Sequence, residues 1–192
     1  MKTVAVAIVL CGLAATVVPA DAQDRWGFEL RTGAAFPTSD LGDADLATGW
    51  GFEGTVAFRV ASTFRVYGGW DWHRFASDDS FAGADIDFEE TGYAFGLLME
   101  QPLASSGTAI RLRAGGTYNH IEVEDDADLT ADSGHGLGWE AGAAVVFTLG
   151  KGWYLTPGAR YRSLSRDLTV LDVTTDVDLR YVALEVGVAK RF

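Results

Sequence analysis

The sequence predicts an all-β fold, an eight-stranded antiparallel up-and-down barrel, and three observations carry this prediction. Runs rich in aromatic and β-branched residues alternate with clusters of Gly, Asp and Ser, and no segment repeats with a helical period. Within each run, large apolar residues occupy every second position. Short and long connections alternate strictly along the chain, which places all the tight turns at one end of the sheet.

The first residues are expected to be removed during export. Lys2 precedes an apolar run from Val4 to about Ala20, and Ala20-Asp21-Ala22 offers the small residues of a cleavage site. We therefore predict a secretory signal peptide at residues 1–22 and a single barrel domain at 23–192. The one cysteine, Cys11, falls in the signal peptide, so the mature chain would form no disulfide.

The eight strands each have one bulky face. They are expected at residues 25–37, 48–60, 64–75, 89–100, 108–121, 136–148, 153–165 and 179–192. In chain order, the bulky faces read Trp26, Phe28, Leu30 and Phe36; Trp50, Phe52, Val56 and Phe58; Phe64, Val66, Trp70 and Trp72; Tyr93, Phe95, Leu97 and Met99; Leu137, Trp139, Val145 and Phe147; Trp153, Leu155 and Tyr161; and Val182, Leu184, Val186 and Val188. The fifth strand contributes Arg111 and Arg113 to the opposite face.

The opposite face combines Gly and Ala with charged residues, and this decides which face points outward. A bulky face turned inward would leave an outer surface of glycine with scattered charges. Turned outward, it leaves small residues and ion pairs inside, which a narrow eight-stranded barrel can hold. That arrangement is favourable only when the surrounding solvent is lipid, so the barrel is predicted to be transmembrane. A soluble lipocalin-like barrel is the rival fold, and it would need no detergent.

The aromatic residues of the bulky faces gather toward the two ends of the strands. Such girdles are typical of the two membrane–water interfaces. The expected interface aromatics are Trp26, Phe28, Trp50, Phe58, Trp70, Trp72, Trp139, Trp153 and Phe192.

The charged residues of the inner face are expected to neutralise one another, because an unpaired charge in a confined interior is costly. We favour a packed polar plug, and a small gated ion path is the alternative. The expected lumen ion pairs use Glu29, Arg31, Glu53, Arg65, Arg113, Glu140, Arg160 and Glu185, with Arg111 and Arg162 on the same face.

Catalytic chemistry has little support in the sequence. The chain has three histidines, and Asp71 with His73 is the most catalytic-looking pair, because both side chains share a strand face. No serine accompanies the pair as a nucleophile. We therefore predict no enzymatic activity, no catalytic residues, no cofactor and no metal cluster of His or Cys.

Three stretches carry a resemblance to a known family: "GFELRTGAAFPTSDL" in the first strand, "YGGWDWHRF" in the third and the terminal "YVALEVGVAKRF". In these stretches the chain resembles small bacterial outer-membrane barrels of the OmpA and OmpX type, the outer membrane protein β-barrel domain family. The resemblance implies an outer-membrane location, periplasmic termini and a last strand, closed by Phe192, that the barrel-assembly machinery reads during insertion. Lys190 departs from the family's apolar pattern, but a lysine near the interface can snorkel to water.

The four long connections, residues 38–47, 77–90, 122–132 and 167–178, hold most of the acidic residues and no Lys or Arg. With a net charge of −12, the chain has no electrostatic reason to bind nucleic acid. On the cell surface these loops would lie among lipopolysaccharide phosphates and bind divalent cations weakly, or they would serve only as a solvated surface. We expect a structural or surface-interaction role with a plugged lumen. A narrow porin-like channel is the second hypothesis and a lipid-modifying enzyme the third.

Overall fold

A computed structural model describes residues 24–80, 82–103, 107–125, 128–170 and 173–192. The expected signal peptide, residues 1–22, lies outside the described residues. Among the described residues, no helix has the length and hydropathy needed to cross a membrane. The described chain forms nine strands: β1 (Trp26–Pro37), β2 (Gly49–Arg59), β3 (Phe64–Ser80), β4 (Gly83–Leu103), β5 (Thr108–Asp125), β6 (Asp128–Asp132), β7 (Gly136–Gly150), β8 (Trp153–Val170) and β9 (Val173–Arg191).

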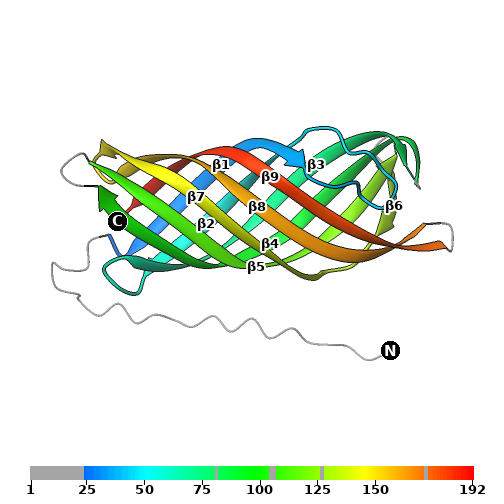
Figure 1. The fold of residues 1–192 in the computed structure, drawn as a ribbon. Helices are drawn as coiled ribbons and strands as arrows, with labels where there is room; N and C mark the ends of the chain where they lie inside the picture. Colours follow the sequence, from blue (N-terminus) through cyan, green and yellow to red (C-terminus); the bar gives the residue numbers. More distant parts are fainter. Residues whose placement is uncertain (1–23, 81, 104–106, 126–127, 171–172) are drawn as a thin grey trace, which may run out of the picture.

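Eight of the strands close into a ring (Figure 1). The order is β4-β3-β2-β1-β9-β8-β7-β5, and pairing of β4 with β5 completes the circle. Every pairing is antiparallel, and the first and last strands meet through ten or more paired positions from Gly27↔Arg191 to Pro37↔Tyr181. The short β6 pairs only with β5, outside the ring. The predicted eight-stranded up-and-down barrel is confirmed.

The two ends of the barrel differ. At one end, which we call the tight-turn end, the terminal residue is held to the first strand by hydrogen bonds between Trp26 and Phe192 main-chain groups (3.0 and 3.2 Å). The opposite, long-hairpin end carries the β3–β4 and β8–β9 hairpins and β6 (Figure 1). The tight turns therefore lie at one end of the ring and the long connections at the other, as the alternation of connections predicts.

Three of the predicted long loops are wrong in their extent. Residues 77–90 and 167–178 are largely strand, because β3 with β4 and β8 with β9 continue as paired hairpins to Ser80↔Gly83 and Val170↔Val173. Residues 122–132 belong mostly to β5 and β6. Strand β4 spans 21 residues, about twice the 9–11 that cross a bilayer. The barrel is therefore longer than the membrane requires.

The alternation continues through these extensions, but the apolar residues change face. On β4, Tyr93, Phe95 and Leu97 point outward and are 47–56% exposed, whereas Ile86 and Phe88 point inward and are at most 2% exposed. The same reversal occurs on the other long strands. Apolar side chains point outward where the barrel is surrounded by lipid, and they point inward where it is surrounded by water. The reversal therefore marks where the barrel leaves the membrane.

Candidate functional site

The lumen is the candidate site, because it gathers the buried charged residues of the described chain. Its centre is Glu53, which is fully buried. Arg113 donates to Glu53 at 2.7 Å, and Arg160 donates to it as well. Arg113 and Arg160 also contact Glu140, from the other side of the barrel. Two carboxylates and two guanidiniums thus form one connected group, in which each charge has more than one partner.

Further pairs extend this group along the barrel axis. Arg162 joins Glu140 (2.7 Å) to Asp71 (2.6 Å), and Arg160 donates to Glu185 at 2.5 Å. Toward the tight-turn end, Arg111 joins Glu29 (2.5 Å) to Glu100 (2.7 Å). We call the central part of this connected set, without its outer partners Asp71 and Glu100, the ionic layer; it comprises Glu29, Arg31, Glu53, Arg111, Arg113, Glu140, Arg160, Arg162 and Glu185.

The eight residues expected to form lumen ion pairs all lie on the inner face, and seven of them belong to the ionic layer. Arg31 donates to Glu29 at 2.8 Å and to Glu185 at 3.4 Å. Arg65 is placed differently, because its guanidinium donates to the main-chain carbonyl of Asp24 at 3.1 Å, near the tight-turn end. This partner could not be predicted from the residue pattern, because every residue type carries a main-chain carbonyl.

The Asp71–His73 pair lies deep in the lumen, and the imidazole does not hold the carboxylate. His73 Nδ1 is 3.9 Å from Asp71 Oδ1 and 3.8 Å from Glu90 Oε2. Arg162 and Asn119 occupy the Asp71 carboxylate instead, at 2.6 and 3.0 Å. Both Asp71 and His73 are at most 2% exposed. The pair is therefore a packed part of the interior, and the carboxylate of Asp71 is bound by the Arg162 guanidinium.

Above the ionic layer, toward the long-hairpin end, the interior becomes apolar. Beyond Arg162 the inner face of β8 carries Leu164 and Leu168, and beyond Tyr181 that of β9 carries Leu179 and Val177. Arg166, between the two leucines of β8, is also buried and donates to the main-chain carbonyls of Asn119 and Leu137. We call this set the apolar layer; it comprises Phe75, Ile86, Phe88, Ile121, Val123, Leu164, Leu168, Val177 and Leu179.

The connection from β1 to β2 covers this layer. Leu41 and Ala44 pair with each other through main-chain hydrogen bonds of 3.0 Å and are fully buried in the same cluster. Two main-chain bonds hold the connection across the opening, from Thr38 to Arg180 and from Ala47 to Ala76, both 2.8 Å. The predicted acidic loop 38–47 is therefore also an apolar lid.

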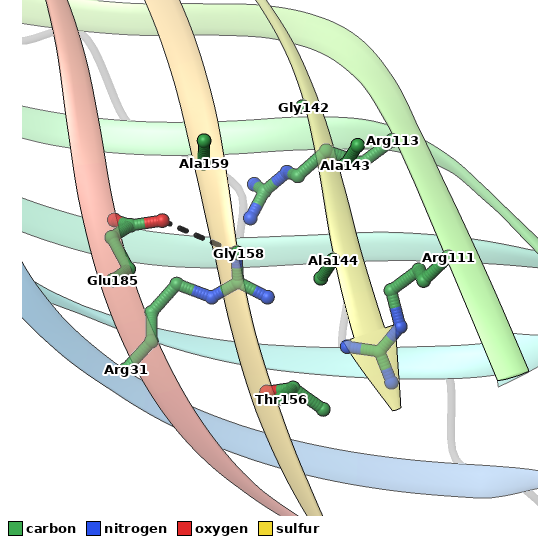
Figure 2. Close-up of a pocket in the computed structure, with 10 residues that line it drawn as sticks. All are labelled: Arg31, Arg111, Arg113, Gly142, Ala143, Ala144, Thr156, Gly158, Ala159 and Glu185. Carbon is green, nitrogen blue, oxygen red and sulfur yellow. Dashed lines mark hydrogen bonds and ion pairs between the residues drawn. The ribbon is translucent and has the colours of Figure 1, made fainter. Parts of the chain in front are cut away.

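Little free volume remains among the charged groups. One cavity beside the ionic layer holds about 10 Å³, and Arg31 of β1, Arg111 and Arg113 of β5 and Glu185 of β9 converge on it (Figure 2). That is about the space of a single water molecule. A larger space of about 300 Å³ lies at the tight-turn mouth, beside Arg59 and Arg191. The lumen thus narrows from an open mouth to a packed centre.

The expected interface aromatics lie on the outer face. The indoles of Trp26, Trp50, Trp70, Trp139 and Trp153 are 40–54% exposed. Neighbouring strands bring some of the rings together, as in the Trp26–Phe58 and Trp50–Trp72 pairs, each 4.9 Å apart. Phe28 and Phe192 are also exposed on this face.

Two clusters of titratable side chains on the outer face of the long-hairpin end were not predicted from the sequence. Glu89, Glu122 and Glu124 lie close together across β4 and β5. Partial burial and the neighbouring Glu89 and Glu122 carboxylates raise the pKa of Glu124, although Arg74 opposes this. The alternation along "ADIDFEE" and "IEVED" could have revealed the cluster, because it places these carboxylates on one face once the strands are extended.

The second cluster unites His120 with Asp132, whose Nδ1 and Oδ1 atoms are 2.9 Å apart. Although burial opposes the shift, the Gly134 N–H and the His120 ring hold the pKa of Asp132 below its usual range. His135 stacks on His120, with ring centres 4.3 Å apart. Because the β5–β6 pairing makes this cluster, the linear spacing of the residues does not reveal it.

A closed antiparallel barrel with an apolar outer belt and a charged interior defines a small outer-membrane β-barrel protein. The chain matches the family described as Outer membrane protein beta-barrel domain over residues 6–192, and it belongs to that family. It is thus a protein of the bacterial outer membrane, and the family resemblance is confirmed.

Solved structures agree in fold. Neisserial surface protein A is 16% identical, with a TM-score of 0.62 over 87% of this chain and 97% of that one. OprG from Pseudomonas aeruginosa is 15% identical, with a TM-score of 0.61 over 88% and 97%. Outer membrane protein W of E. coli is 15% identical, with a TM-score of 0.54 over 88% and 99%. No curated protein matches the chain.

Proposed function

We propose that this protein is a non-conducting surface scaffold, whose plugged barrel carries an acidic, rigid rim for interactions at the cell surface. The observation that supports the proposal is that two barriers, the ionic layer and the apolar layer, lie one above the other inside the barrel. A permeating ion would have to separate Glu53 from Arg113 and Arg160, then enter an apolar layer in which Phe75 and Phe88 are fully buried. Each barrier alone opposes conduction. Passage through the ionic layer would break ion pairs, and passage through the apolar layer would strip the ion of its water.

The plug is tested by ion flux into vesicles. Phospholipid vesicles that contain the refolded barrel and a pH-sensitive dye are given a proton gradient with valinomycin and potassium. We expect the wild-type barrel to leak no faster than empty vesicles. Leakage proportional to the amount of inserted barrel would favour the narrow-channel hypothesis instead.

The orientation of the barrel follows from its charges. The long-hairpin end carries acids such as the exposed Asp176 and the half-buried Asp178, whereas the tight-turn end carries Arg59 and Arg191. We propose that the acidic rim faces the cell exterior and that both termini face the periplasm, as the family resemblance implies.

The partner of the rim would be lipopolysaccharide, through divalent cations. We place the Glu89, Glu122 and Glu124 carboxylates at the height of lipid headgroups, because they lie on the outer face of β4 and β5 beyond the exposed apolar rings of Tyr93 and Tyr118. Carboxylate oxygens are ligands for Ca²⁺ and Mg²⁺, and a cation shared with a phosphate would cancel both negative charges. Partial burial and the neighbouring Glu89 and Glu122 carboxylates raise the pKa of Glu124, and a bound cation would offset the repulsion among these carboxylates.

This interaction is tested by unfolding the barrel in vesicles with and without lipopolysaccharide. Calcium should raise the unfolding midpoint more strongly when lipopolysaccharide is present, and the Glu122→Gln, Glu124→Gln double variant should lose most of that gain. Equal effects of calcium in both membranes would leave the rim as a solvated surface with no lipid partner.

A further inference from the structure

The histidine cluster at the long-hairpin end lies outside the lumen, and it shares one carboxylate, Glu122, with the acidic cluster of Glu89, Glu122 and Glu124. It consists of His120, Glu122, Asp132 and His135. His120 and Glu122 lie two residues apart on the outer face of β5, and Asp132 ends β6, opposite Glu122 in the pairing of the two strands. The cluster is therefore built on paired strands.

The geometry points to a binding site for a divalent transition metal ion, of the Zn²⁺ class, with His120, Glu122 and Asp132 as ligands; we propose this site as a second function of the protein's outer surface. His120 Nδ1 is 2.9 Å from Asp132 Oδ1 and 3.8 Å from Glu122 Oε1. In a tetrahedral zinc site with bonds of about 2.0–2.1 Å, ligand atoms are separated by about 3.3 Å. The observed separations lie on either side of this value.

The main chain around Asp132 holds the carboxylate in place. The Gly134 N–H donates to Asp132 Oδ1 at 2.8 Å. The next residue, Ser133, is fastened to β5 twice, because its N–H donates to the Ile121 carbonyl (3.0 Å) and its hydroxyl accepts from the Ile121 N–H (2.8 Å). The ligands from β5 and from the end of β6 are thus held together before any ion arrives, which lowers the ordering cost of binding.

His135 supplies the candidate fourth ligand. Its ring lies nearly parallel to that of His120, at an angle of 15°, and it is exposed to solvent. It stands between Gly134 and Gly136, which give the main chain freedom to turn the imidazole toward the ion. Two imidazoles with two carboxylates suit zinc, nickel or copper, whereas Ca²⁺ and Mg²⁺ prefer oxygen ligands alone.

Binding exchanges a proton for the metal at one atom. In the unliganded cluster, the proton between His120 Nδ1 and Asp132 Oδ1 belongs to the imidazole. When Nδ1 donates its lone pair to the metal, that proton moves to Nε2 of a neutral ring by way of solvent, or leaves a doubly protonated ring altogether. No oxidation occurs, and no covalent bond forms between protein atoms.

The test is isothermal titration calorimetry of the mature, tag-free barrel, refolded in detergent micelles, with ZnCl₂ in a buffer containing millimolar CaCl₂. We expect one saturating zinc event per barrel that calcium does not suppress. His120→Ala should weaken it at least tenfold, and His135→Ala should weaken it less. Asp178→Asn, which removes a carboxylate from the same end of the barrel but outside the cluster, should leave the affinity unchanged.

Two outcomes would overturn the proposal: zinc binding that His120→Ala and Asp178→Asn affect equally, or zinc binding that calcium abolishes. Either one would reduce the cluster to ordinary acidic surface. Folding of each variant is checked by the heat-dependent shift of barrel mobility on a gel. Imidazole NMR resonances give a second readout, because zinc should shift those of His120 and leave those of the buried His73 in place.

Discussion

Charge neutralisation inside the barrel depends on individual carboxylates with several partners. Glu53 is the clearest case, because it is fully buried and accepts from both Arg113 and Arg160, while Arg31 Nε lies 3.6 Å away. Removing this carboxylate would leave the neighbouring guanidiniums short of negative charge in a buried site. The residue is therefore central to the ionic layer.

Glu53→Gln should destabilise the folded barrel by about 3–5 kcal/mol, the usual cost of breaking a buried ion pair by removing one partner. The measurement is the free energy of unfolding from urea titration in detergent micelles. Asp178→Asn is the matched control, because its ion pair with Arg180 is exposed and should contribute about 0–1 kcal/mol. Similar losses in the two variants would contradict the central role of Glu53.

A second residue-scale prediction concerns the outer acidic cluster. The folded-state pKa of Glu124 lies above its usual value, so its ionisation costs stability above that folded pKa. Below the unfolded-state pKa of about 4.3, the residue is protonated in both states and the cost disappears.

Glu124→Gln should therefore raise the urea midpoint modestly at pH 7, and the difference from wild type should vanish below about pH 4. High salt should shrink the effect, since the neighbouring Glu122 and Arg74 side chains are partly exposed to solvent. A lower midpoint for the variant at pH 7 would mean that the carboxylate makes a favourable contact there.

At the scale of strands, the sequence predicts the barrel wall well and the length of its extensions poorly. In the lipid belt, alternation such as Trp70 and Trp72 against Asp71 and His73 has one physical reading, and at the tight-turn end the strand bounds lie within a few residues of the prediction. Beyond the belt, segments such as residues 85–88 alternate equally well. However, Asp on the outward face imitates the composition of a loop, so these strands were missed.

The lumen site could likewise be predicted only in part. Charges such as Glu140 and Arg160 could be assigned to the lumen because a strand face contains them. Their partners could not be assigned, since partners meet across the barrel, as Arg162 meets Asp71 over 91 residues of sequence. The expectation that the chain holds no histidine metal cluster rested on linear spacing alone, and pairing of β5 with β6 brings His120 to Asp132.

Strand β2 offers a matched pair of glycines that tests how closely the inner face packs. A Cβ atom on Gly51 would lie 2.3 Å from the His73 ring and 2.5 Å from the Trp72 carbonyl oxygen, whereas one on Gly54 would meet nothing within 4 Å. Gly51→Ala should cost about 1–3 kcal/mol of folding free energy, because main-chain atoms would have to move. Gly54→Ala should be neutral or stabilise the strand by about 0.5–1 kcal/mol. Refolding yields and urea titrations of both variants would expose the reverse order, which would argue against close packing at Gly51.

For the whole molecule, the reversal of apolar faces explains one chain with two kinds of interior. In the lipid belt the outside is apolar and the inside ionic; beyond it the outside is acidic and the inside apolar. Each half suits its own solvent, and together they stack an apolar layer on an ionic one. A barrel built this way has a rigid projection above the membrane, supported by its own small core.

Orientation in the cell is open to cysteine labelling, since the chain has no cysteine outside the expected signal peptide. Asp176→Cys should react with a membrane-impermeant maleimide on intact cells, because it is exposed at the acidic rim. Ser62→Cys, exposed at the tight-turn end, should react only after the outer membrane is permeabilised. The opposite pattern would invert the proposed orientation.

The most direct test of the plugged lumen is single-channel recording of the mature barrel in a planar bilayer, with a known porin in the same membrane as a positive control. The account predicts a silent wild-type barrel, and silence also for Leu168→Ser, because the ionic layer remains closed beneath the apolar one. Reproducible openings of the wild type whose conductance changes with Arg160→Ala or Glu140→Ala would contradict the account, since ions would then be passing through the ionic layer.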